Sequence, residues 1–158
     1  MKNTTYSDYF ALQARQQAMA ATPMDMQAAV EFMEELKALP SLRIDYGDNG
    51  CEDRSNLVQF LLKNRNVPHG CGAIQFPDTH QWHYHFAAYG EVATNAGPQK
   101  VMFDPTEFDQ IILLDDWKKA WNARTPKPIC IFTASGMTTF RKERQLLENL
   151  HAYSAEAT

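Results

Sequence analysis

The chain has 158 residues, 44% of them hydrophobic and 11% aromatic, which is enough apolar material for one domain with a sizeable core. Its formal net charge is -4 without any lysine or arginine run, so nucleic acid is not an expected partner. No segment reaches the roughly 18 apolar residues that span a membrane, and the N-terminus lacks the apolar core of a signal peptide. We therefore expect one soluble domain over residues 1–158, either cytoplasmic or exported without a leader.

The first 40 residues predict a helical layer. Residues 5–21 carry apolar side chains at partly helical spacing, and the Thr22-Pro23 pair ends that pattern. A second helix is expected to start at Pro23 and to run to Pro40, with Asp25 in its first turn.

A cysteine stands at the start of the next predicted helix. Turn-forming residues fill 45–50, and apolar residues recur at helical spacing from Leu57 until a break over residues 64–68. Cys51 therefore falls in the first turn of this helix.

After residue 70 the apolar pattern takes the period of strands. We predict four strands, a connection over residues 95–99, a short helix over residues 113–124 and a closing helix over residues 138–153. Trp117 and Trp121 lie one turn apart in the short helix, where core packing is favoured over a ligand platform. Helices followed by a mostly antiparallel sheet define an α+β fold with its core over residues 48–134. The predicted strands cover residues 71–76, 81–92, 100–104 and 128–134.

Cys51 is a candidate nucleophile. Unpaired backbone N–H groups and the helix dipole make a helix start positive, which favours a thiolate there and could hold an oxyanion. Most cysteines are packing residues. That role suits Cys130 better, because its neighbours are apolar, whereas the neighbours of Cys51 are polar. Cys71, beside two glycines, is ambiguous.

Two further residue types complete the set that thiol catalysis requires, a base and a group that orients it. Side chains alternate along a strand, so His83, His85 and Ala87 share one face, and alternation alone does not choose between the histidines. Asp104 ends the following strand because Pro105 cannot continue a ladder. If these two strands pair, the carboxylate can reach an imidazole and fix its tautomer. The alternative is a pair of surface histidines and a turn-forming aspartate.

Three motifs in this order resemble one known family. They are Gly50-Cys51 with an arginine at position 54, the aromatic strand WHYHFA over residues 82–87, and Asp104-Pro105-Thr106. The pattern is similar to that of the bacterial protein-glutaminases, a branch of the transglutaminase-like and papain-like cysteine enzymes. The resemblance covers roughly residues 48–124.

The resemblance implies a transglutaminase or papain-like core and a Cys-His-Asp triad. Cys51 would be the nucleophile, His85 rather than His83 the base and acid, and Asp104 the orienting group. The implied reaction is deamidation of glutamine in a protein or peptide through a thioester, with no cofactor and no metal. As residues that bind the substrate or its oxyanion we predict Glu52, Trp82 and His83.

Three alternatives stay open. The same core supports transglutaminases and cysteine proteases, which differ in leaving group and acceptor. A metal-binding module without catalysis would use Cys51 or Cys71 with His80, His83 or His85, although the paired cysteines of strong zinc motifs are absent from the sequence. A catalytically idle member of the fold is the third. Compact size and the expected lack of a leader would also fit a bacterial effector.

Overall fold

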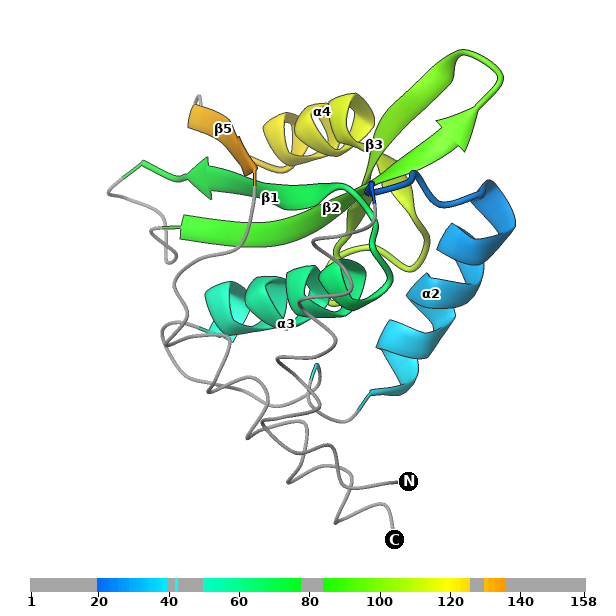
Figure 1. The fold of residues 1–158 in the computed structure, drawn as a ribbon. Helices are drawn as coiled ribbons and strands as arrows, with labels where there is room; N and C mark the ends of the chain where they lie inside the picture. The colour runs from blue at the N-terminus through cyan, green and yellow to red at the C-terminus, as the bar shows by residue number, and fades with distance from the viewer. Residues whose placement is uncertain (1–19, 40–41, 43–49, 78–83, 126–129, 136–158) are drawn as a thin grey trace, which may run out of the picture.

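The computed structural model of the protein describes residues 20–39, 42, 50–77, 84–125 and 130–135 (Figure 1). All strand pairings within the sheet formed by these residues are antiparallel, and the strand order is β4-β3-β2-β1-β5. The predicted α+β class with a mostly antiparallel sheet is confirmed. In chain order the elements are α2 (Met26–Ala38), α3 (Gly50–Asn64), β1 (His69–Gln75), β2 (Tyr84–Thr94), β3 (Gly97–Phe103), β4 (Ile112–Leu113), α4 (Leu114–Arg124) and β5 (Cys130–Ser135).

The predicted helices around Cys51 and over residues 113–124 are present as α3 and α4. The closing helix predicted for residues 138–153 lies outside the described residues. So does the helix predicted for residues 5–21, except for its last two residues, which are not helical.

The second predicted helix starts later than its sequence indicates. The prediction that Pro23 is its first residue is wrong, because the backbone of Met24 pairs with β2 instead. The Met24 N–H donates to the Glu91 carbonyl at 2.9 Å, and the Ala93 N–H donates to the Met24 carbonyl at 2.7 Å. These two bonds hold residue 24 extended, so the helix cannot include it.

Asp25 caps this helix rather than lying in its first turn. Its Oδ1 accepts the Ala28 N–H at 2.7 Å, so it satisfies one of the free N–H groups at the helix start. The helix ends at Ala38, two residues before Pro40.

The four predicted strands are present as β1, β2, β3 and β5, although residues 81–83 and 128–129 of the predictions lie outside the described residues. The connection predicted over residues 95–99 is shorter in the structure, a two-residue turn of Asn95 and Ala96. Gly97 follows with a φ of 93°, a backbone conformation that glycine adopts without strain. Thr94 braces the turn by donating from Oγ1 to the Gly97 carbonyl at 2.6 Å. The two-residue strand β4 was not predicted.

The sheet separates two apolar layers. In Figure 1, α3 covers one face and α4 the other, while α2 packs beside the β2–β3 end of the sheet. Phe32 of α2 meets Phe103 of β3 edge to face at 5.0 Å between ring centroids, in the same layer as Phe60 of α3. Trp117 and Trp121 of α4 form the opposite layer. Burial of each such side chain stabilises the fold by about 1.5–3 kcal/mol.

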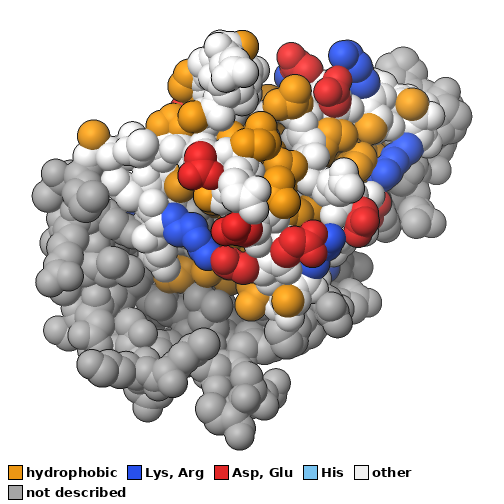
Figure 2. All heavy atoms as spheres, turned by 90° about the vertical axis from the view of Figure 1, so that its right-hand side faces the viewer, with side chains coloured by type: hydrophobic (Ala, Val, Ile, Leu, Met, Phe, Trp, Pro, Cys, Tyr) orange, Lys and Arg blue, Asp and Glu red, His pale blue; other side chains and the backbone are white. Residues whose placement is uncertain are grey.

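One end of the molecule carries a mixed surface. Figure 2 looks onto the α2 side, where charged side chains of both signs lie among apolar ones. Met26 and Val30, one turn apart on α2, are both 43% exposed.

β3 stops short of the end of its neighbour. Its last residue, Phe103, pairs with Ala88, whereas β2 extends four residues further, to Tyr84, alongside β1. Asp104 and Pro105 turn the chain away at this point. Among the described residues, no strand covers the β3-facing edge of β2 over its first residues, and the candidate site lies at this open edge.

Candidate active site

The predicted imidazole and carboxylate meet in the core. His85 Nε2 lies 2.9 Å from Asp104 Oδ2, and both side chains are buried, with His85 and Asp104 each 3% exposed. Alternation along β2 places His85 and Ala87 on one face, as predicted, and this face packs against α4. Phe103 pairs with Ala88 on the opposite face. Asp104 is the next residue along the chain, so its side chain comes to the face that carries His85 and Ala87.

Cys51 approaches from the opposite layer and reaches the imidazole through the open edge of β2. The thiol contacts the Tyr84 carbonyl at 3.8 Å and is also hydrogen-bonded to the backbone N–H of Phe86 and to the side chain of His85. Tyr84 and Phe86 present these backbone groups to the side that β3 leaves uncovered. If β3 continued past Phe103, one of its residues would occupy the position of the sulfur. The early stop of β3 therefore allows Cys51 of α3 to contact His85, whose side chain lies on the opposite face of the sheet.

The environment of Cys51 favours a thiolate. Burial alone would raise the pKa of the Cys51 thiol, but several contacts outweigh it. Hydrogen bonds from His85 and from the Phe86 N–H, together with the positive charges of His85 and Arg54, bring the pKa of Cys51 below its ordinary value.

The environment of His85 favours the imidazolium. Burial alone would lower the pKa of His85, but the hydrogen bonds and negative charges of Asp104 and Cys51 raise the pKa of His85 to about 9. A thiolate beside an imidazolium that an aspartate holds is a nucleophile with a proton donor already in place.

Two tryptophans of α4 enclose this pair, and their role was not predicted beyond packing. The Trp117 indole N–H donates to Asp104 Oδ2 at 2.9 Å. The Trp121 ring lies over His85 with 4.8 Å between ring centroids. The sequence signal was only the helical spacing of two aromatic residues after Asp104, which does not indicate where an indole N–H points.

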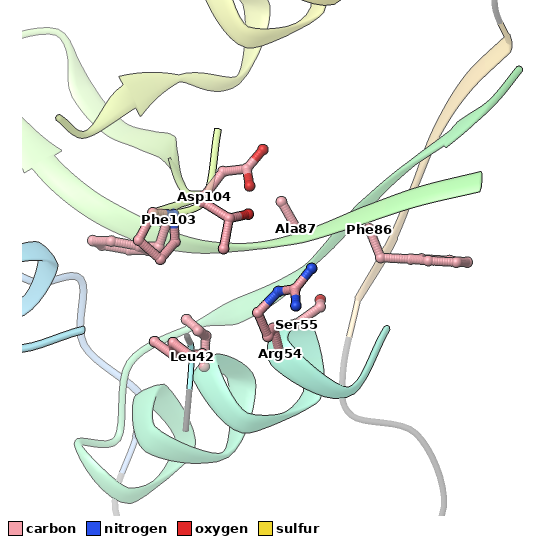
Figure 3. Close-up of a pocket in the computed structure, with 10 residues that line it drawn as sticks. Leu42, Arg54, Ser55, Phe86, Ala87, Phe103 and Asp104 are labelled. Carbon is pink, nitrogen blue, oxygen red and sulfur yellow. The ribbon is translucent and has the colours of Figure 1, made fainter. Parts of the chain in front are cut away.

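A pocket opens on the other side of Asp104, between α3 and the strands (Figure 3). The empty volume of this pocket is about 240 Å³, which includes the space at its mouth that is open to solvent. Arg54 extends into it from α3, and Phe86 and Ala87 line it from β2 (Figure 3). The remaining lining residues are Leu42, Ser55, Val58, Phe103, Asp104, Pro105 and Thr106.

The residues predicted to bind the substrate are only partly described. Glu52 lies in the first turn of α3, half-buried, next to Cys51. Trp82 and His83 lie outside the described residues. Their predicted role, like the catalytic roles of the triad, stays a prediction.

In the described part of the chain, no three histidine, cysteine or acidic side chains group closely enough to hold a metal ion. His80 and His83, which the metal-binding alternative uses, are outside that part. Neither Cys51 nor Cys71 forms a disulfide. No helix among the described residues is long and apolar enough to cross a membrane.

Comparison with known proteins agrees with the fold and the family expected from the three motifs. A sequence model of the family described as Glutaminase matches residues 25–121, more than half of the chain and a segment that includes Cys51, His85 and Asp104. The protein therefore belongs to this glutaminase family.

A solved structure shares the fold. The NMR structure of protein-glutaminase from Chryseobacterium proteolyticum is similar over 74% of this chain and 75% of that one, with a TM-score of 0.57 and 15% sequence identity. No curated protein matches the sequence.

Proposed function

We propose that the protein is a cysteine-dependent amidohydrolase that converts glutamine side chains of proteins or peptides to glutamate. The contact of Cys51 with an imidazole that Asp104 holds is the observation that carries this proposal. Membership of the glutaminase family supports amide hydrolysis. The similar fold of a protein-glutaminase supports glutamine within a polypeptide as the substrate.

In the first half-reaction the Cys51 thiolate attacks the δ-carbonyl carbon of the glutamine. A carbon–sulfur bond forms, and the carbonyl electron pair moves to oxygen. The His85 imidazolium then gives its proton to the amide nitrogen, the carbon–nitrogen bond breaks, and ammonia leaves a thioester on Cys51. His85 Nε2 faces Asp104, so Nδ1 is the ring nitrogen left for this transfer.

The start of α3 is the proposed oxyanion site. Cys51 follows the first residue of the helix, where backbone N–H groups have no partner within the helix and the dipole is positive. Two such N–H groups beside the sulfur can stabilise the negative oxygen of the tetrahedral intermediate. In this assignment Glu52 contributes its backbone N–H, because its carboxylate cannot donate a hydrogen bond when ionised.

In the second half-reaction water replaces ammonia. Neutral His85 takes a proton from the water, the oxygen attacks the thioester carbon, and the carbon–sulfur bond breaks. Glutamate leaves, and the thiolate and imidazolium are restored. Asp104 stabilises the imidazolium in both halves without itself gaining the proton.

Ammonia release from a glutamine-containing protein such as casein tests the proposal. We expect release by the native protein and loss by at least about 10⁴-fold in Cys51→Ala, because the nucleophile of a triad is removed. Cys71→Ala is the matched control, since that half-buried thiol lies on β1 and is not in the proposed triad. It should keep the native rate.

Mass spectrometry of the same substrate separates the alternatives. Conversion of glutamine to glutamate in an intact chain supports deamidation. Cleaved peptide bonds without conversion would assign the protein to the proteases, and cross-links to added amines would assign it to the transglutaminases. Equal ammonia release from the native protein and Cys51→Ala would end the enzymatic proposal.

A further inference from the structure

One carboxylate oxygen of Asp104 receives two hydrogen bonds. Trp117 Nε1 and His85 Nε2 both lie 2.9 Å from the same atom, Oδ2. An indole N–H only donates, so Oδ2 is the acceptor in the Trp117 bond. Oδ2 is therefore a shared acceptor that joins the indole of α4 to the imidazole of β2.

The Trp117 bond determines which atom donates in the hydrogen bond between His85 Nε2 and Asp104 Oδ2. With one lone pair of Oδ2 taken by the indole, the second accepts from His85, so Nε2 carries the hydrogen. In neutral His85, Nδ1 then carries no hydrogen and is the ring nitrogen available to the hydrogen bond with Cys51. Trp117 thus acts on the tautomer of His85 through Asp104, two hydrogen bonds away from the imidazole.

Trp117 is held so that this donor cannot turn away. Its side chain is completely buried. Gly72 of β1 makes room for the indole, because a Cβ at that position would lie 3.1 Å from the six-membered ring of Trp117 and 3.1 Å from the end of Met102. Asp104 and His85 are also buried, so both hydrogen bonds to Oδ2 lie where such bonds are strong.

We propose that Trp117 is a positioning residue of the active site, which holds the Asp104 carboxylate and, through it, the imidazole tautomer that serves Cys51. This inference rests on the proposed role of the three residues in catalysis. It assigns to α4 a part in the chemistry as well as in the core.

Trp117→Phe tests the inference because it keeps an aromatic ring and removes the N–H. We expect kcat for ammonia release to fall about ten- to one-hundred-fold, the loss that follows from one hydrogen bond to a charged group, while KM changes less than twofold. A second readout needs no substrate. The pH dependence of Cys51 alkylation by iodoacetamide, measured in a Cys71→Ala background, should shift its midpoint upward in Trp117→Phe.

Trp121→Phe is the comparison variant. It also exchanges a buried tryptophan of α4 for phenylalanine, but Trp121 Nε1 has no hydrogen-bond partner among the described residues. A packing role alone for both tryptophans predicts equal effects of the two substitutions. The inference predicts the larger shift of the alkylation midpoint in Trp117→Phe, because Trp121→Phe keeps a ring beside His85 and removes no hydrogen bond to Asp104.

The outcomes separate this inference from the proposed function. A native alkylation midpoint in folded Trp117→Phe overturns the role of Trp117 and leaves deamidation standing. A shifted midpoint in a protein that releases no ammonia from glutamine supports Trp117 and overturns deamidation. If Trp117→Phe does not fold, 3-benzothienylalanine at position 117 replaces the N–H by sulfur in a ring of nearly the same shape, and the same midpoint decides.

Discussion

The two sides of β2 at the candidate site differ in their access to water. On the α4 side, His85 is 3% exposed and contacts Asp104, Cys51 and the rings of Trp117 and Trp121. On the other side Tyr84, whose carbonyl contacts the sulfur, is 48% exposed. His85 and Asp104 thus lie where hydrogen bonds and charges act strongly, whereas the half-buried Cys51 lies nearer the exposed side, where the proposed substrate would approach.

Asp104→Asn should have the largest effect on the difference between the two sides of β2. It keeps an oxygen acceptor for His85 but removes the negative charge from the buried α4 side. We expect kcat for ammonia release to fall by about 10²–10⁴-fold, as for other triads whose orienting carboxylate is neutralised. Steady-state kinetics on the protein substrate measures the loss, and a native kcat would contradict the role of Asp104.

The pH profile of Asp104→Asn shows in which direction the Asp104 charge shifts the pKa of His85. His85 in the native protein has its pKa raised to about 9, so the imidazolium and the activity that needs it are lost as pH rises through about 9. Removing the Asp104 charge lowers the pKa of His85, and the alkaline limb of kcat/KM should move to lower pH. The stability that the raised pKa contributes has the same sign: it is complete below the ordinary pKa of 6.5 and is lost as pH rises through about 9.

Alanine substitutions at Gly72 and Gly90 compare the α4 side with the α3 side, and we expect their effects to be smaller than that of Asp104→Asn. A Cβ at Gly72 meets Trp117 on the α4 side, whereas a Cβ at Gly90 would lie 3.2 Å from both Leu62 and Phe103 on the α3 side. Gly72→Ala and Gly90→Ala should each lower the free energy of unfolding by about 1–3 kcal/mol, because both overpack the core.

Only one of the two should change the chemistry. Gly72→Ala displaces the indole that donates to Asp104, so we expect a lower kcat at temperatures where the variant is fully folded. Gly90→Ala should keep the native kcat under the same conditions. Urea unfolding together with kcat measures both properties, and equal loss of kcat in the two variants would argue against a special role of the α4 side.

Asp25→Ala should have the smallest effect. It removes the carboxylate that accepts the Ala28 N–H at the start of α2. Such a cap stabilises a helix by about 1 kcal/mol, so the free energy of unfolding should fall by that amount. Asp25→Asn keeps a capping oxygen and should restore most of that stability. The melting temperature reports the difference between them. Activity at 25 °C should stay native in both, and a fall in kcat would mean that α2 also affects the site.

Local patterns were enough to predict much of this fold. The turn cluster before Cys51 and the apolar spacing from Leu57 predicted α3, and alternation predicted that His85 and Ala87 share a face. The start of α2 was predicted wrongly, since a proline at a first helical position has the same local signature whether or not the residue after it pairs with a distant strand. Met24 does pair, with residues about 70 positions away along the chain.

The geometry of the site was only partly predictable. Pro105 indicated that β3 ends at Asp104. The sequence did not indicate that Phe103 pairs with Ala88, which leaves four residues of β2 beyond the end of β3. That offset depends on the register between two strands, and it decides whether a sulfur from α3 can reach an imidazole on the opposite face. The donor from Trp117 to Asp104 depends on how α4 docks on the sheet, which the helical spacing of Trp117 and Trp121 does not contain.

The early stop of β3 also bears on self-association. A strand whose N–H and C=O groups have lost their neighbour is a template for a strand from another molecule, and proteins usually protect such edges with charge, proline or a covering segment. Here the sulfur of Cys51 contacts the Tyr84 carbonyl and the Phe86 N–H, the groups that an incoming strand would use. Cys51 therefore occupies backbone groups that an added strand would use, at the edge where the proposed substrate would approach.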